Sequence, residues 1–144
     1  MSLSSRTPFH ESGWVKVQTP LGPSIAPHVE IGLKGTDGQW QQFDMKIDSG
    51  AAITFLNEED KEILGFKEED GEECEWKAVN NTPVPSRVLT LDLRIGQRYI
   101  GKARVAFSTD KKRDGDRLFG VLDVYNTLHI ALRARVSKNF FAFD

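Results

Sequence analysis

The stretch Phe43-Asp44-Met45-Lys46-Ile47-Asp48-Ser49-Gly50-Ala51 is the most informative part of this chain. Apolar and polar residues alternate up to Ile47, which predicts a half-buried β-strand that ends at Asp48. Asp48 therefore lies where the chain leaves the core. Gly50 permits a tight turn and the close approach of another backbone, and Ser49 can hold the loop by hydrogen bonding. Such an aspartate can be a functional group, or it can simply cap a turn.

The segments on either side of this stretch also carry clear patterns. A strand over residues 29–33 is joined by the turn at 35–38 to the strand over 40–48, which predicts a β-hairpin leading into Asp48. After residue 56 the pattern changes to that of a two-turn helix. Asn57 is a good N-cap, acidic residues follow it in the first turn, and Gly65 fits the position just past the last turn.

The rest of the chain is predicted to be mainly β. Apolar alternation predicts long strands over 84–95 and 99–107, joined by a turn at 96–97. The segment 68–75 is acidic and expected to be exposed, and 111–117 is expected to be a polar loop whose basic run 111–113 is solvated. An apolar segment at 118–122, a short helix at 123–128, and strands at 130–132 and 140–143 complete the expectations. The three tryptophans are expected to pack in the core or at its rim.

Size and composition fit one domain. The 144 residues carry a formal net charge of −2, so they give no electrostatic reason to expect nucleic acid or a membrane as a partner. We expect a partly ordered arm over 1–27, with one short strand near 14–17, and a domain over 28–144. The single cysteine, Cys74, cannot form an intramolecular disulfide, and its acidic neighbours argue against a catalytic thiolate. Because no signal peptide or transmembrane segment is recognisable, we expect a cytoplasmic location.

Two landmarks together resemble the retropepsin-like (retroviral-type) aspartic peptidases, in particular their bacterial-type members. The first is the strand that leads into Asp48-Ser49-Gly50-Ala51, followed by a short helix closing in Leu64-Gly65-Phe66. The second, about seventy residues later, is Leu118-Phe119-Gly120 followed by the segment 123–128. The resemblance covers residues 28–144. It implies a mostly β fold, a closed or partly open barrel of the single-lobed acid protease type with one or two short helices.

The resemblance also implies an activity. Aspartic peptidases use two carboxylates that share a proton, one activating a water while the other polarises the scissile carbonyl. This chain has one Asp-Ser-Gly motif, so the second carboxylate would come from Asp48 of another copy in a symmetric homodimer. The substrate would be a polypeptide, and neither a cofactor nor a metal would be needed. The histidines at positions 10, 28 and 129 show no metal-ligand spacing.

The family pattern assigns further roles around Asp48. Ser49 would hydrogen-bond across the dimer axis, Gly50 would let the substrate backbone pass, and Ala51 would pack behind the loop. Leu118, Phe119 and Gly120 would support that loop from beneath. The apolar segment 140–143 is a candidate for an intersubunit sheet, and a plain edge strand of the core is an equal alternative.

The chain departs from the family at two places. The flap that would close over substrate falls on Val79, Asn80, Asn81 and Thr82, where no glycine is present and where Pro83 and Pro85 remove backbone donors, so we expect a shorter or stiffer flap. After Gly120 one residue is inserted and the arginine that commonly braces the dimer is missing, which predicts a weaker dimer. The alternative function is therefore a catalytically inactive dimerisation or peptide-binding module of the same fold.

Overall fold

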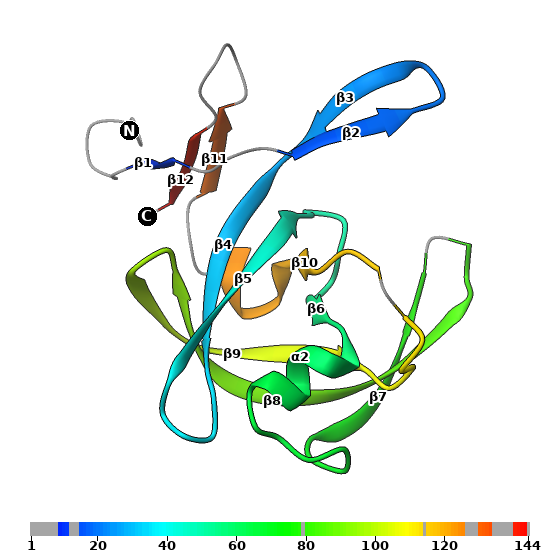
Figure 1. Ribbon diagram of the computed structural model, residues 1–144, viewed down its shortest axis with the longest axis vertical. Helices are drawn as coiled ribbons and strands as arrows, with labels where there is room; N and C mark the ends of the chain where they lie inside the picture. The colour runs from blue at the N-terminus through cyan, green and yellow to red at the C-terminus, as the bar shows by residue number, and fades with distance from the viewer. Residues whose placement is uncertain are drawn as a thin grey trace.

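A ring of 6 strands forms the body of the protein. The computed structural model describes residues 9–11, 15–78, 80–113, 115–125, 130–133 and 140–143. In ring order the strands are β4 (His28–Lys34), β5 (Trp40–Ile47), β10 (Leu118–Phe119), β6 (Thr54–Leu56), β9 (Arg98–Ser108) and β8 (Pro83–Ile95), and β8 pairs back onto β4 (Figure 1). The expected mostly β barrel is confirmed.

The hairpin β4–β5 forms as the alternation predicts. Ile31 lies opposite Phe43 and Val29 lies opposite Met45, and all four side chains are buried. The two strands are joined by a turn in which Gly38 has a φ of 79°, a left-handed conformation that glycine adopts without steric cost. Asp48, which directly follows β5, therefore lies at the edge of the core.

The core lies inside the ring. Inward-facing residues of the long strands β8 and β9 meet those of β4 and β5, as expected when alternate residues of each strand face the barrel interior. The main cluster consists of Val29, Ile31, Leu33, Phe43, Met45, Ile47, Leu56, Leu64, Leu91, Leu93, Ile95, Ala103, Val105, Phe107, Phe119 and Val124. The second landmark of the sequence therefore contributes Phe119 directly to the core.

The short helix α2 (Glu58–Ile63) follows β6, as predicted. The backbone N–H of its N-cap, Asn57, donates to the carboxylate of Asp60 over 2.9 Å, and Gly65 just past its end has a φ of 87°. Lys61 is buried, and its ammonium donates to the carbonyls of Glu68 and Asp70. Burial lowers the pKa of Lys61. These bonds tie the acidic loop beyond the helix to α2 itself.

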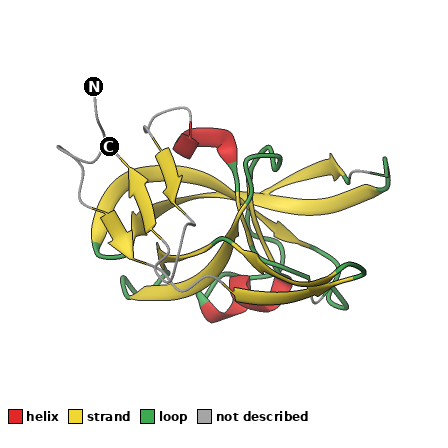
Figure 2. Cartoon of the chain, turned by 90° about the horizontal axis from the view of Figure 1, so that it is seen from above, coloured by secondary structure: helices red, strands yellow, loops and turns green. Residues whose placement is uncertain are grey.

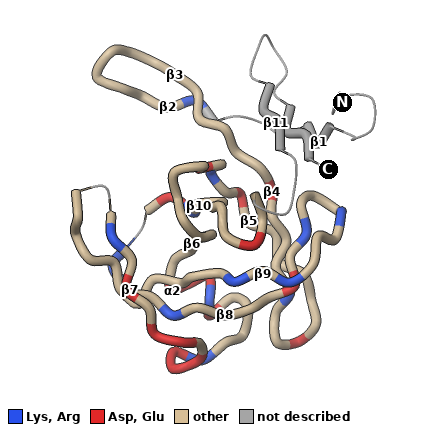
Figure 3. The backbone as a smooth tube through the Cα atoms, turned by 180° about the vertical axis from the view of Figure 1, so that it is seen from behind, with Lys and Arg blue, Asp and Glu red and all other residues tan. Residues whose placement is uncertain are grey.

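A seventh strand, β7 (Glu72–Lys77), extends the ring at β8 and was missed in the sequence. Its acidic side chains are exposed, as expected, but Cys74 and Trp76 are half-buried opposite Ser86 and Val84. Figure 3 shows how acidic residues gather in the loop between α2 and β7. The predicted exposed segment is therefore partly a strand that forms a hairpin with β8.

The short strand predicted near 14–17 in the N-terminal arm is present, but two further strands of the arm were missed. β2 (Val15–Thr19) and β3 (Gly22–Ala26) form a separate hairpin, and β1 (Phe9–Glu11) pairs with β12 (Phe140–Phe143). β12 also pairs with β11 (Ile130–Arg133), so it is the middle strand of a three-stranded sheet beside the barrel (Figures 1 and 2). The alternative of an edge strand at 140–143 is therefore wrong.

The prediction of a short helix over 123–128 was wrong for residues 123–125, the part of it that the structure describes. The chain makes a single wide turn, η1 (Val121–Tyr125), in which Leu122 is extended and Asp123 has a φ of 63°. Residues 126–128 lie outside the described residues. None of the helices in the described part of the chain is long and apolar enough to cross a membrane.

Candidate active site

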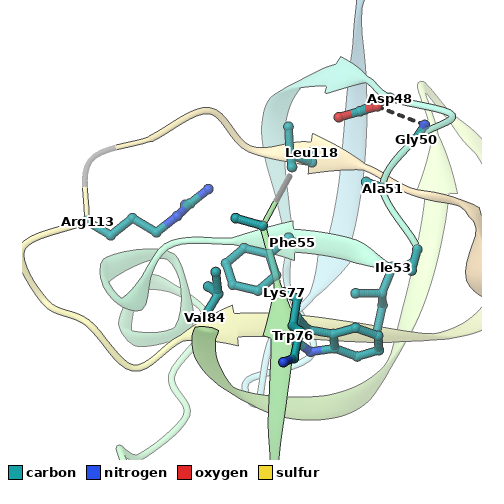
Figure 4. A pocket seen from close by; sticks show the side chains of 12 residues that line it. Asp48, Gly50, Ala51, Ile53, Phe55, Trp76, Lys77, Val84, Arg113 and Leu118 are labelled. Atoms are coloured by element: carbon teal, nitrogen blue, oxygen red, sulfur yellow. Dashed lines mark hydrogen bonds between the residues drawn. The ribbon is translucent and has the colours of Figure 1, made fainter. Parts of the chain in front are cut away.

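Asp48 begins a tight loop at the end of β5. The N–H of Gly50 donates to the carboxylate Oδ1 of Asp48 over 2.9 Å, and the N–H of Ala51 donates to its carbonyl over 3.1 Å (Figure 4). The Asp48 side chain is half-buried, whereas Ser49 and Gly50 are exposed. The loop thus fixes the orientation of one carboxylate oxygen and leaves the carboxylate accessible.

The second sequence landmark braces this loop. β10 lies between β5 and β6, parallel to β5, so that Phe119 is level with Ile47. The N–H of Asp48 donates to the carbonyl of Phe119 over 3.1 Å, and the N–H of Val121 donates to the carbonyl of Ala51 over 3.0 Å. The structure therefore brings together the two segments that carry the resemblance.

Gly120 is required by close packing of backbone. A Cβ atom at this position would lie 2.2 Å from the carbonyl oxygen of Ile53, which no real side chain tolerates. The N–H of Gly120 also donates to the buried hydroxyl of Thr54 over 3.2 Å. The chain passes close against the backbone of Ile53 and Thr54, where β6 begins, and only glycine leaves space for this approach.

Tyr125 is a neighbour of Asp48 that the sequence did not single out. Its hydroxyl donates to the carbonyl of Phe119 over 3.1 Å, and its ring lies 5.6 Å from the Phe119 ring between centroids. Burial, and then the charge of Asp48, raise the pKa of Tyr125. The tyrosine therefore remains a neutral hydrogen-bond donor beside the carboxylate loop.

A groove of about 390 Å³ opens between the Asp48 loop and the β7–β8 hairpin. Its size lies in the range typical of ligand sites. The walls are mainly apolar, with one carboxylate and two cations at the margins, and Figure 4 shows how these side chains face the groove. The lining residues are Asp48, Gly50, Ala51, Ala52, Ile53, Phe55, Trp76, Lys77, Ala78, Val84, Arg113 and Leu118.

The candidate flap residues lie at the turn of the β7–β8 hairpin. Asn81 has a φ of 65°, and the N–H of Ala78 donates to the carbonyl of Thr82 over 2.9 Å, which closes the turn. Pro83 and Pro85 do not prevent pairing, since they lie opposite Lys77 and Glu75 in β7. Val79 lies outside the described residues.

The hairpin contributes its stem to the groove, and Asn80, Asn81 and Thr82 are exposed beyond it. The stem is anchored by Trp76, whose Nε1–H donates to the Ser86 hydroxyl, which in turn donates to the Cys74 carbonyl, both over 2.9 Å. Trp76 also packs against the cluster around Ile53 and Phe55, so its expected packing role is confirmed. The groove wall is therefore held by both hydrogen bonds and apolar contact.

Arg113 corrects the prediction that the whole basic run 111–113 is solvated, because Arg113 is half-buried while Lys111 and Lys112 are exposed. Its guanidinium lies 4.9 Å above the Phe55 ring and lines the groove. It donates to the side-chain oxygen of Asn57, and over 3.1 Å to the carbonyl of Asp116. Burial lowers the pKa of Arg113. No local sequence signal marks this contact, because Phe55 and Asn57 are far away in the chain.

A second arginine of the same loop fixes β10. Arg117 makes a two-pronged ion pair with Asp60, at 2.9 Å for each of the two bonds, and Asp60 is completely buried. This hydrogen-bonded pair raises the pKa of Arg117. The start of α2 is thereby joined to the residue that precedes Leu118, so the loop that carries Arg113 is held at its C-terminal end.

Asp123 occupies the region where the dimer-bracing arginine of the family is missing. Its carboxylate accepts hydrogen bonds from the guanidinium and the backbone N–H of Arg104 in β9, over distances between 2.8 and 3.0 Å. These bonds hold the pKa of Asp123 below its usual range. Asp123 is therefore engaged in an ion pair within its own chain. In the described part of the chain, no group of three or more His, Cys, Asp or Glu side chains could hold a metal ion.

Comparison with known proteins supports the fold. No family model and no curated protein sequence matches the chain. Among solved structures, it is similar to the crystal structure of a retropepsin-like aspartic protease from Rickettsia conorii, with a TM-score of 0.57 at 14% identity over 90% of this chain and 98% of the other. A likeness to EIAV protease complexed with the inhibitor HBY-793 has a TM-score of 0.49 at 16% identity, over 72% of this chain and 88% of that chain. The former likeness shows the retropepsin-like fold that the sequence predicted.

Proposed function

Because the chain has a retropepsin-like fold, we propose that it is an aspartic endopeptidase that acts as a symmetric homodimer. Asp48 of each subunit supplies one of the two carboxylates, and the substrate is a polypeptide. The observation that carries the proposal is the setting of Asp48. Its loop is held by the carbonyl of Phe119 from behind, and its carboxylate lies at one end of a largely apolar groove.

The need for a second copy follows from the chemistry. Hydrolysis through two carboxylates requires one to accept a proton from the attacking water and the other to donate a hydrogen bond to the scissile carbonyl. Asp48 is the only acidic side chain among the described residues that line the groove. One chain therefore holds half of the catalytic pair, and a two-fold axis beside Asp48 would supply the other half.

The surrounding residues support the same function. Gly50 and Ser49 are exposed beside the carboxylate, where substrate backbone and the partner loop could approach. The stem of the β7–β8 hairpin faces the Asp48 loop across the groove and is available to hold an extended peptide by backbone pairing. Ile53, Phe55, Val84 and Leu118 provide apolar walls for its side chains.

Peptide cleavage by the purified protein tests this proposal. A mixed fluorogenic peptide library is assayed between acidic and neutral pH, with wild type and Asp48→Asn compared at equal dimer content by sedimentation. We expect cleavage by wild type and by the control variant Asp44→Asn, and none by Asp48→Asn. Asp44→Asn is the matched control, because this exposed carboxylate lies on the same strand and outside the groove. A wild-type dimer that binds peptides but cleaves none would favour the inactive binding module.

A further inference from the structure

Arg113 is a cation in an otherwise apolar part of the groove. Figure 4 shows its side chain reaching into the groove from the side opposite Asp48, with Leu118 between them. Its neighbours there are the apolar side chains Phe55, Val84 and Leu118. A charged group in such a setting loses part of its hydration, and a matching opposite charge compensates this loss most effectively.

The hydrogen-bonding capacity of Arg113 is only partly used. A guanidinium has five N–H donors, and this one donates to the side-chain oxygen of Asn57 and to the carbonyl of Asp116. Both acceptors are neutral. No carboxylate of the described residues lies within 4.0 Å of the guanidinium, whereas Arg117 in the same loop has a complete partner in Asp60. Burial lowers the pKa of Arg113, and the charges of Asp116, Asp60 and Asp110 offset this effect in part.

The guanidinium is also held in place before any ligand arrives. Phe55 supports one face at 4.9 Å, and Gly115 lies so close that a Cβ there would be 3.1 Å from Nη2. The pair between Arg117 and Asp60 anchors the end of the loop. A cation fixed in this way loses little conformational entropy on binding a carboxylate.

We propose that Arg113 is a specificity-determining residue that binds an acidic side chain of the peptide substrate, on the far side of Leu118 from Asp48. This inference rests on the proposed peptidase function and adds the substrate class to it: peptides with glutamate or aspartate near the scissile bond. Lys77, exposed on the hairpin wall of the same groove, adds a second positive charge and favours the same peptides.

Matched peptides measure this preference directly. A set of peptides is made in which each carries one glutamate at a different position near the scissile bond. Each peptide is compared with a second one that has glutamine at the same position, which has the same shape without the charge. At one position we expect wild type to favour glutamate by roughly 10-fold in kcat/KM, in line with a charge-assisted hydrogen bond in a partly desolvated site. Arg113→Gln removes this preference and Arg113→Glu reverses it towards lysine.

Two further variants keep the test decisive. Lys112→Gln removes the same charge from an exposed side chain of the same loop that does not line the groove, and it keeps the glutamate preference. Arg113→Lys keeps the charge but lacks the two-pronged donor geometry, so we expect it to lower the glutamate preference several-fold. This variant replaces Arg113→Gln in the test if Arg113→Gln does not fold. A preference that Arg113→Gln or Arg113→Lys leaves unchanged overturns the assignment.

Binding separates this inference from the proposed activity. The same peptide pairs are titrated into Asp48→Asn by fluorescence anisotropy, with and without Arg113→Gln. Cleavage by wild type without a glutamate preference refutes the role of Arg113 and leaves the peptidase standing. If no peptide is cleaved, glutamate-selective binding that depends on Arg113 still supports the acidic-peptide site. Binding without that selectivity, or no binding, overturns it.

Discussion

The backbone N–H of Asp48 donates a 3.1 Å hydrogen bond to the carbonyl oxygen of Phe119. This bond joins the two segments of the sequence that carry the family resemblance, and it lies directly behind the carboxylate loop. The same carbonyl accepts the Tyr125 hydroxyl. A carbonyl has two lone pairs, so it can serve both donors at once. Phe119 is therefore the residue through which the barrel fixes the position of Asp48.

Tyr125→Phe tests the contribution of the second donor. The ring contact with Phe119 is retained while one hydrogen bond is lost, so we expect the free energy of unfolding to fall by about 1 kcal/mol in urea denaturation. If the tyrosine positions the Asp48 loop, kcat also falls while KM changes little. An unchanged kcat with the expected loss of stability would limit Tyr125 to a structural role.

Gly120→Ala tests the close approach of the chain to the backbone at the start of β6. A Cβ would meet the Ile53 carbonyl at 2.2 Å, and because both groups are backbone, neither can move aside easily. We expect a loss of roughly 3 kcal/mol in the free energy of unfolding, at the high end for overpacking. Gly115→Ala is the comparison, since the atoms nearest its new methyl are side-chain atoms of Arg113, at 3.1 Å or more, and not backbone. Equal stability of the two variants contradicts the packing account.

The buried pair between Arg117 and Asp60 predicts strong coupling. Arg117→Met leaves a fully buried carboxylate without its charged partner, so it should lower the free energy of unfolding by about 3 kcal/mol. Adding Asp60→Asn should recover part of this loss. A double-mutant cycle measured by denaturant unfolding is expected to give a coupling energy above about 1 kcal/mol, and additive effects would show that the pair is not energetically linked.

Asp123→Asn predicts a pH-dependent effect. Hydrogen bonds from Arg104 lower the pKa of Asp123 in the folded protein, so its contribution to stability is present above the unfolded pKa and is lost as the pH falls through the folded value. Asparagine tolerates the left-handed backbone at this position, where φ is 63°, so the change removes mainly the charge. The urea midpoint of the variant is expected below that of wild type at pH 7, with the gap closing below about pH 4. A gap that persists unchanged at pH 2.5 speaks against the ion pair.

Local patterns predicted the elements that lead to Asp48. The alternation of apolar and polar residues was sufficient to predict the hairpin 28–47. Asn57 and its acidic neighbours were sufficient to predict α2. Both signals depend only on residues close in sequence. β7 was missed because its many glutamates concealed the alternation of Cys74 and Trp76. That alternation is the signal that could have revealed the strand.

The parts of the site that the sequence did not predict depend on contacts between distant residues. Arg113 looked like one more charge in a solvated run, and only the fold places it over Phe55. The pairing of Arg117 with Asp60 likewise joins residues 57 positions apart and has no local pattern. The turn at 121–125 differs from the expected helix because Asp123 adopts a left-handed conformation to reach Arg104.

The most direct test of the central claim is the activity of mixed dimers. Wild type and Asp48→Asn are unfolded together, refolded at defined ratios and assayed with one cleaved peptide. If each active site needs Asp48 from both subunits, activity falls with the square of the wild-type fraction, to about a quarter in an equal mixture. A linear decrease, to about half in that mixture, or cleavage by Asp48→Asn alone, would contradict a shared pair of Asp48 carboxylates.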